Sequence, residues 1–228
     1  MLGGHVSPSM VVRGIIKRGG EQGAQHSQAL HSWYAHIPGL RVVMPATPAD
    51  ARDLMIAAVQ SPDPVLYIDD RWLYDWEDEL APAADIDLND VKPAVRREGG
   101  DITIVAAGFS VRLALQAAEM LKPLGIECEV LDLRVLNPFD ASALRVSVGK
   151  TGRLIAVDGG WETCGLAGEG FAGAMEGVPL GALKASPVRI TLPHAPAPTS
   201  KPLEQAYYTT PDTVVAAAIA MIEATKPV

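Results

Sequence analysis

Short apolar runs alternate with amphipathic stretches along most of the chain, and this alternation predicts an α/β fold. The runs with the length and the side chains of buried strands are residues 11–16, 41–44, 65–68, 102–106, 129–133 and 154–158. Apolar residues at helical spacing follow at residues 48–58, 111–121 and 211–222. Strands that alternate with helices are expected to pair in parallel through crossover connections.

Two of the predicted helices carry a clear start signal. Thr47 precedes Pro48, and Thr210 precedes Pro211. A threonine side chain can cap the free N–H groups of a first turn, and proline is tolerated at the first helical position. We therefore expect helices to begin at both places, the first of them between two parallel strands.

An acidic stretch divides the chain. Residues 75–90 contain seven acidic residues, no basic residue and Pro82. Such a segment is typical of an exposed connection. We predict a linker at residues 76–91 between an N-terminal piece, residues 1–75, and a doubly wound α/β domain, residues 92–228.

The composition limits the function classes. The chain has 228 residues, of which 48% are hydrophobic and 20% charged, as in one or two globular domains. The spacing of Cys128 and Cys164 suggests neither a disulfide framework nor a zinc site, so we expect a reducing cytoplasm. The sequence shows neither a leader-like start nor a run of about 18 apolar residues, so we expect neither secretion nor a membrane span. A net charge of −8 argues against nucleic acid as a partner.

Three histidines, His26, His31 and His36, lie five residues apart. A step of five residues turns a helical side chain by about 140°, so they cannot share one face as zinc ligands. His26 follows a glycine-rich loop, where an imidazole can act as a proton donor or base. A capping or buried structural histidine is the alternative. Ser27 beside it has no orienting acid and is rejected as a nucleophile.

Glycines also follow the strand at residues 154–158, in the order Asp158-Gly159-Gly160. The G-x-G-x-x-G order of a dinucleotide-binding loop is missing. We expect a tight backbone turn at this point.

Residues 23–28, with the sequence Gly-Ala-Gln-His-Ser-Gln, and residues 36–51, from His-Ile-Pro-Gly-Leu to Pro-Ala-Asp-Ala, carry a family resemblance. They resemble the β subunit of the E1 component of 2-oxoacid dehydrogenases, thiamine-diphosphate enzymes of transketolase type. The resemblance continues at residues 63–65, 73–74, 97–99, 101–105, 147–153 and 202–204, and thus covers nearly the whole chain. At residues 91–93 the chain departs from it, with Val-Lys-Pro where relatives usually have Gly-Lys-Ala.

The resemblance implies a partial pyrimidine-binding domain at residues 1–75, lacking its N-terminal part, and a transketolase C-terminal domain at residues 92–228. It places His26 at the mouth of the thiamine site as a catalytic residue that contacts the substrate or the incoming lipoyl group. The glutamate that activates thiamine diphosphate is expected on a partner chain, so no cofactor-binding residue is assigned here. Backbone atoms of Ala58, Ser61 and Asp63 are candidates for a monovalent cation such as K⁺.

These implications predict a split enzyme that is inactive without its partner. An α-like chain would bind thiamine diphosphate and Mg²⁺ and carry the missing half of the pyrimidine-binding domain, because a half sheet exposes an unpaired edge. The assembled hetero-oligomer would decarboxylate a 2-oxo acid or cleave a ketose, and transfer the acyl or glycolyl unit to a lipoyl or carrier-protein acceptor. The alternatives are a non-catalytic docking subunit that recruits an acyltransferase, and a degenerate relic.

Overall fold

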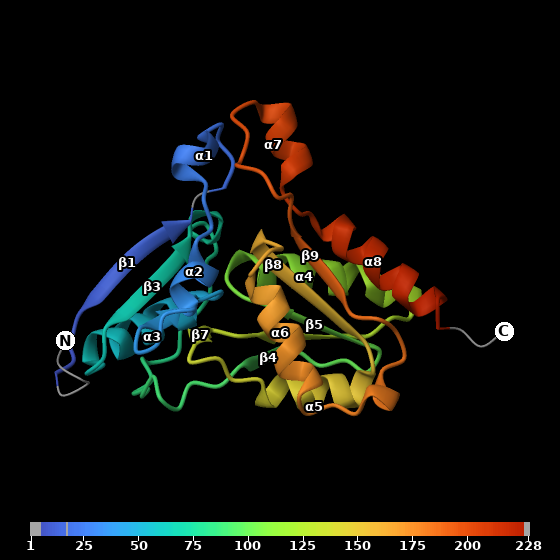
Figure 1. Cartoon of the computed structure of the whole chain (residues 1–228), viewed down its shortest axis with the longest axis horizontal. Coiled ribbons are helices and arrows are strands. Elements are labelled where there is room, and N and C mark those ends of the chain that lie inside the picture. Colours follow the sequence, from blue (N-terminus) through green and yellow to red (C-terminus); the bar gives the residue numbers. More distant parts are fainter. Residues whose placement is uncertain (1–5, 17, 226–228) are drawn as a thin grey trace.

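The computed structural model describes residues 6–16 and 18–225, which form two β-sheets side by side with helices packed around them (Figure 1). The predicted α/β class, with a doubly wound second half, is confirmed. No helix among these residues combines the length and the apolar character needed to cross a membrane.

The first sheet has the strand order β1-β3-β2-β7. Its strands are β1 (Val11–Ile16), β2 (Arg41–Val43), β3 (Val65–Asp70) and β7 (Val135–Asn137). The first three are parallel, as expected for strands joined by crossovers. Strand β7 comes from the second half of the chain and runs antiparallel to β2, so both halves build this sheet.

Helix α3 (Pro48–Gln60) covers one face of the first sheet. It begins where the sequence predicts, because the Thr47 hydroxyl accepts a hydrogen bond from the Asp50 N–H at 3.2 Å. Its buried face packs Leu54 against the strands. The short helices α1 (Gly23–His26) and α2 (His31–Ala35) lie in the connection from β1 to β2.

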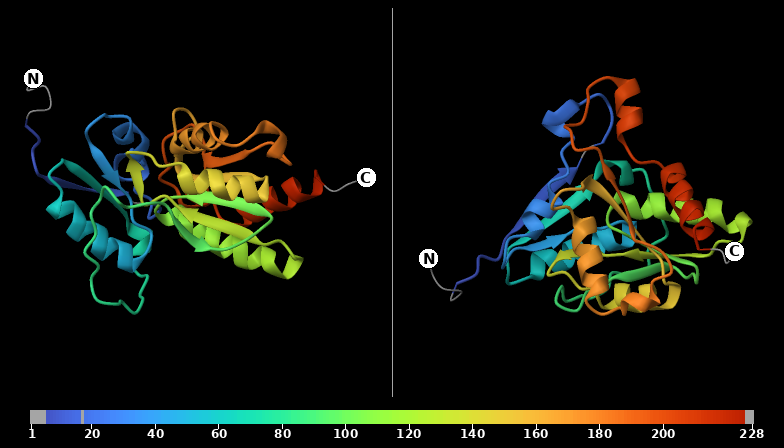
Figure 2. Two further views of the ribbon diagram at one scale, coloured as in Figure 1. Left: turned by 90° about the horizontal axis from the view of Figure 1, so that it is seen from below. Right: turned by 45° about the vertical axis from the view of Figure 1, so that its right-hand side comes forward.

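The second sheet has the order β4-β6-β5-β8-β9, with only β4 antiparallel. Its strands are β4 (Ala94–Arg97), β5 (Ile102–Ala106), β6 (Cys128–Asp132), β8 (Leu154–Trp161) and β9 (Val188–Leu192). Helices lie on both sides of it (Figure 2). These are α4 (Phe109–Leu121) and α8 (Pro211–Glu223) on one face, and α5 (Ser142–Thr151) and α6 (Leu166–Met175) on the other. Helix α7 (Lys201–Tyr207) precedes α8, and 3₁₀ turns occur at Arg71–Leu73, Lys122–Leu124 and Leu180–Ala182.

The acidic segment after residue 73 contains no helix or strand before β4. Most of its side chains are exposed, but Leu88 is buried against the cluster under α3. The Arg52 guanidinium of α3 donates a hydrogen bond to the Ala81 carbonyl at 2.7 Å. The segment therefore lies along α3.

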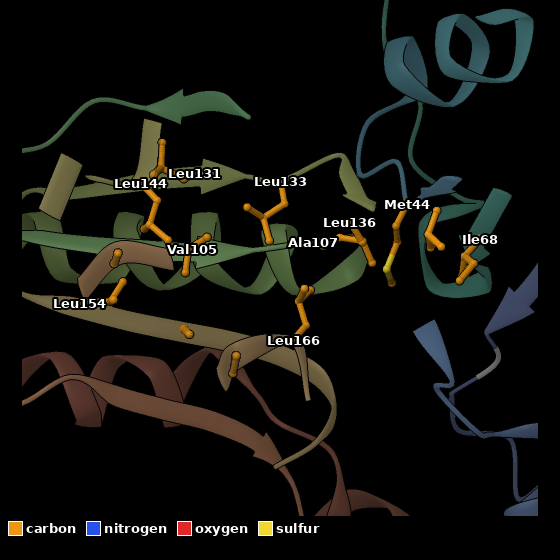
Figure 3. Close-up of a cluster of buried hydrophobic side chains, with 14 of the residues drawn as sticks. Met44, Ile68, Val105, Ala107, Leu131, Leu133, Leu136, Leu144, Leu154 and Leu166 are labelled. Carbon is orange, nitrogen blue, oxygen red and sulfur yellow. The ribbon is translucent and has the colours of Figure 1, made fainter. Parts of the chain in front are cut away.

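One hydrophobic cluster connects the two sheets. Figure 3 shows Met44, which follows β2, beside Leu136 of β7 and facing Ala107, which follows β5. All three side chains are buried in the same cluster as Ile68 of β3. The two halves of the chain consequently share one core.

A buried charged cluster also joins the halves. The Arg96 guanidinium of β4 donates to the Asp132 carboxylate at 3.0 and 2.8 Å and also pairs with Asp50 of α3. Asp132 is fully buried, and this burial raises the pKa of its carboxyl to about 6 although Arg96 and Arg134 oppose the shift. Arg96 therefore neutralises a charge that has no access to water.

We predict that Arg96→Ala lowers the free energy of unfolding by about 3 kcal/mol, because the buried Asp132 carboxylate then loses one of its two opposing charges and keeps only Arg134. Urea denaturation at pH 7 measures this change. Arg189→Ala, which breaks an exposed pair with Glu162, is the control and should cost less than about 1 kcal/mol. Equal, small effects of both substitutions would contradict the role assigned to Arg96.

Candidate functional site

The candidate site lies where the segment from Arg18 to His31 meets the carboxyl end of β8. The segment leaves β1 through a turn in which Gly19, Gly20 and Gly23 have positive φ angles of 67°, 73° and 59°. Such angles favour glycine. In open α/β sheets, ligands bind outside the carboxyl ends of the strands, and this segment lies at the ends of β1, β3 and β8.

Arg18 connects this segment to both sheets. Its Nε lies 2.7 Å from the Asp70 carboxylate at the end of β3, and both side chains are buried. The guanidinium carbon lies 5.8 Å from the centre of the Phe109 ring of α4. A Cβ on Gly159 would come within 1.8 Å of Arg18 Nη2, so only glycine leaves room for the guanidinium.

His31 connects the segment to the same strand. Its Nε2 lies 2.8 Å from Asp158 Oδ1, with 1% and 3% of the two side chains exposed. Burial alone raises the pKa of the Asp158 carboxyl. The His31 ring and the N–H groups of Gly160 and Ala167 outweigh that effect and hold the pKa below its ordinary value. The contact thus favours an ionised Asp158.

The prediction of a tight turn at Asp158 is wrong. Strand β8 continues through Gly159 and Gly160 to Trp161. The glycines instead allow close approach: a Cβ on Gly160 would lie 3.0 Å from His31 Cε1. Glycine inside a strand often marks such a contact, and this is the signal that the sequence offered.

His26 ends α1, and its side chain is exposed. It lines neither of the two cavities described below. Ser27 is buried, and its hydroxyl has no hydrogen-bond partner within the part of the chain that the structure describes. His31 is buried in its contact with Asp158, whereas His36 is exposed like His26. The structure therefore separates the three histidines and presents His26 outward.

Two cavities flank the segment. The first, of about 990 Å³, lies between α2, the turn after β7 and the loop after β8, and its walls include Trp33, Phe139 and Trp161. The second, of about 650 Å³, is bounded by Gly20, Trp72 and residues of α4 and α7. Both have mainly aromatic and apolar walls.

These walls do not suit the diphosphate end of thiamine diphosphate. Magnesium bound to phosphates prefers carboxylate and other oxygen ligands. Among the described residues, no group of three or more His, Cys, Asp or Glu side chains could hold a metal ion. The one arginine in the first cavity, Arg189, is paired with Glu162 at 2.7 Å. The division of the cofactor site between two chains stays a prediction.

The turn expected to bind a monovalent cation follows α3. The Ala58 carbonyl accepts a hydrogen bond from the Ser61 N–H at 3.3 Å, and the Ser61 carbonyl accepts one from the Ser9 hydroxyl at 2.8 Å. The Asp63 carboxylate accepts one from Arg41 Nε at 3.0 Å. A carbonyl oxygen has two lone pairs, so these bonds do not decide whether a cation binds, and a cation bound to this backbone stays a prediction.

We predict that Asp158→Asn lowers the free energy of unfolding by about 2 kcal/mol at pH 7, because it removes a buried, charge-assisted contact with His31. The pKa of Asp158 is lowered in the folded state, so its contribution is present above pH about 4 and is lost as the pH falls further. Urea titrations from pH 7 to pH 3 measure the difference from wild type. A difference of the same size at both ends of this range would contradict the assignment, and the exposed Asp78→Asn serves as the control.

Two family models match the chain. The model of the "Transketolase, pyrimidine binding domain" matches residues 1–75, and that of the "Transketolase, C-terminal domain" matches residues 92–214. A solved structure described as "Split gene transketolase, inactive beta4 tetramer" superposes with a TM-score of 0.76 and 25% identity. That similarity covers 95% of this chain and 67% of the other.

Curated relatives have similar sequences. The chain is 38% identical over 222 residues to the acetoin:2,6-dichlorophenolindophenol oxidoreductase subunit beta of Bacillus subtilis (strain 168), covering 97% of this chain and 64% of that relative. It is 40% identical over 161 residues to the pyruvate dehydrogenase E1 component subunit beta of Rhizobium meliloti (strain 1021), covering 71% of this chain and 35% of that relative. The chain thus spans about 64% of the length of the acetoin relatives that it matches. With more than half of its residues matched by the C-terminal domain model alone, the chain belongs to the transketolase family, and the resemblance to E1 β subunits is confirmed.

Proposed function

We propose that this chain is the β-type subunit of a thiamine-diphosphate-dependent 2-oxoacid dehydrogenase and supplies one wall of its active site. The assembled enzyme decarboxylates a 2-oxo acid and transfers the acyl unit to a lipoyl or carrier-protein acceptor. The observation that carries this proposal is the placement of the His26 segment at the carboxyl ends of β1, β3 and β8, inside the region matched by the pyrimidine-binding model. The name of one relative, a pyruvate dehydrogenase, supports the reaction class, whereas acetoin, named in the other, has no carboxylate to lose.

In this proposal the cofactor and Mg²⁺ are held mainly by an α-like partner chain, which also supplies the activating glutamate. That division agrees with the aromatic and apolar walls of the two cavities. The exposed imidazole of His26 donates or accepts a proton at the mouth of the site, where the substrate or the acceptor arrives. Cys128 and Cys164 are both free, which suits a reducing compartment such as the cytoplasm.

The outer edge of β1 is the proposed place of assembly. Strand β1 is at the end of its sheet and pairs only with β3 among the described residues. Val12 and Ile15 on β1 are 49% and 42% exposed, and Met10 just before it is 50% exposed. A parallel edge with apolar side chains is normally covered. We assign its cover to a further segment of the pyrimidine-binding fold.

A ketose substrate is the second candidate for the same site, because the superposed structure is described as a split-gene transketolase. That description also calls its β4 tetramer inactive. We expect the present chain to be inactive alone, because an incomplete site cannot orient a cofactor and a substrate together. Adding a 2-oxo acid or a ketose to the assembled complex distinguishes the two reactions.

We predict that His26→Ala lowers turnover of the reconstituted complex by about a hundredfold or more, because a positioned acid or base contributes rate factors of this order. The assay combines this chain with its α-like partner, thiamine diphosphate, Mg²⁺ and a 2-oxo acid. His194→Ala, another exposed histidine, should leave turnover unchanged. Size-exclusion chromatography verifies that each variant still assembles.

Unchanged turnover of an assembled His26→Ala complex would exclude catalysis by His26. The chain would then act as a docking subunit that recruits an acyltransferase component. Turnover by the isolated chain would exclude the split arrangement, and a stable monomer that binds no partner would favour a structural relic.

A further inference from the structure

Helix α1, which ends at His26, cannot hold its own position. It has only four residues, and helices of that length are unstable in isolation. The residue that caps its start, Gln22, makes no side-chain capping hydrogen bond. Glu21 just before it has a φ angle of +57°, which is uncommon for a residue with a side chain. The placement of His26 must therefore depend on contacts from elsewhere in the chain.

Glu204 of α7 provides one such contact. Its Oε1 and Oε2 atoms each lie 3.0 Å from the backbone N of Glu21, across 183 residues of sequence. In return, the Glu21 carboxylate accepts a hydrogen bond from the Lys201 N–H at 3.3 Å. Glu204 is buried, and a buried carboxylate requires hydrogen-bond donors. The strained Glu21 backbone supplies one of them.

Close packing accompanies this contact. Figures 1 and 2 show α1 and α7 side by side, apart from the main body of the two sheets. A Cβ on Gly23, the first residue of α1, would lie 2.4 Å from Thr199 Cγ2. Helix α1 therefore rests directly on the residues that precede α7.

His26 lies midway between two anchors. Glu21, bound by Glu204, is five residues before it, and His31, bound by Asp158, is five residues after it. Glu204 and Asp158, which bind these two residues, both come from the second half of the chain. The contact between His31 and Asp158 follows α1 in the sequence and belongs to the buried site described above. The contact between Glu21 and Glu204 precedes α1, in the connection that leaves β1.

We propose that Glu204 is a positioning residue for His26: its carboxylate holds the backbone at Glu21 and thereby fixes α1 and the direction of the imidazole. The catalytic consequence rests on the proposed function, but the positioning of α1 by Glu204 does not. Glu204 touches no reacting group and acts only through the peptide backbone.

Amide hydrogen exchange on the isolated chain tests the positioning. In Glu204→Ala, exchange in a peptide covering residues 19–28 should become at least about tenfold faster, because the N–H of Glu21 loses its acceptor. Glu204→Gln keeps one acceptor oxygen and should show a smaller increase. Leu203→Ala, at an exposed position of the same helix, is the matched control and should show none. Protection in β5 reports whether each variant remains folded.

Unchanged exchange at residues 19–28 in a folded Glu204→Ala or Glu204→Gln chain would overturn the proposal. Faster exchange throughout the chain, equally in β5, would also overturn it, because Glu204 would then stabilise the whole fold rather than α1.

A double-mutant cycle in the reconstituted complex tests the link to His26. Glu204→Ala should lower kcat in the wild-type background and have no further effect when His26 is already alanine. An equal decrease in both backgrounds would show that Glu204 acts by another route and would overturn the link. If His26→Ala itself leaves turnover unchanged, the proposed function fails, whereas the exchange result still decides the positioning.

Discussion

The contact between the segment from Arg18 to His31 and the end of β8 is the interaction on which the site depends. His31 pairs with Asp158 of β8, and the neighbouring Arg18 pairs with Asp70 at the end of β3; all four side chains are buried. Charges removed from water are costly unless each meets its partner in good geometry, so these pairs allow few other placements of the segment. Gly159 and Gly160 make the contact possible, because side chains there would occupy the space of the guanidinium and the imidazole.

The shared architecture restricts where a partner can bind. Strand β7 from the second half closes one edge of the first sheet, and the buried cluster around Met44 and Leu136 joins that sheet to the second one. The edge of β1 is the end of the first sheet that remains without a neighbouring strand among the described residues. A segment that completes the pyrimidine-binding fold would therefore lie beside β1, near the start of the segment that carries His26.

Much of the fold was predictable because its central strands are continuous apolar runs and two of its helices carry threonine–proline starts. The elements that were missed lack those signals: β7 has three residues, α1 has four, and β4 is an edge strand with two arginines. Helix α6 contains Gly168, Gly170 and Gly173, which weaken a helical pattern. The hydrophobic periodicity of one segment also cannot show that β7 joins a sheet whose other strands come from the first half of the chain.

The site was less predictable than the fold. His26 was identified through family resemblance, not from spacing, and its role stays a prediction. The pairing of His31 with Asp158 joins residues 127 positions apart, so a pattern within one segment cannot identify the partner. The two glycines after Asp158 were the available signal, but a turn explains adjacent glycines as readily as close approach does.

The central claim is that this chain supplies only one wall of a thiamine-diphosphate site. Isothermal titration of the cofactor, with Mg²⁺ present, measures this most directly when applied to the isolated chain and to its mixture with an α-like partner. The account predicts saturable binding by the mixture and none by the chain alone. Stoichiometric binding to the isolated chain, with an affinity that the partner does not change, would contradict it.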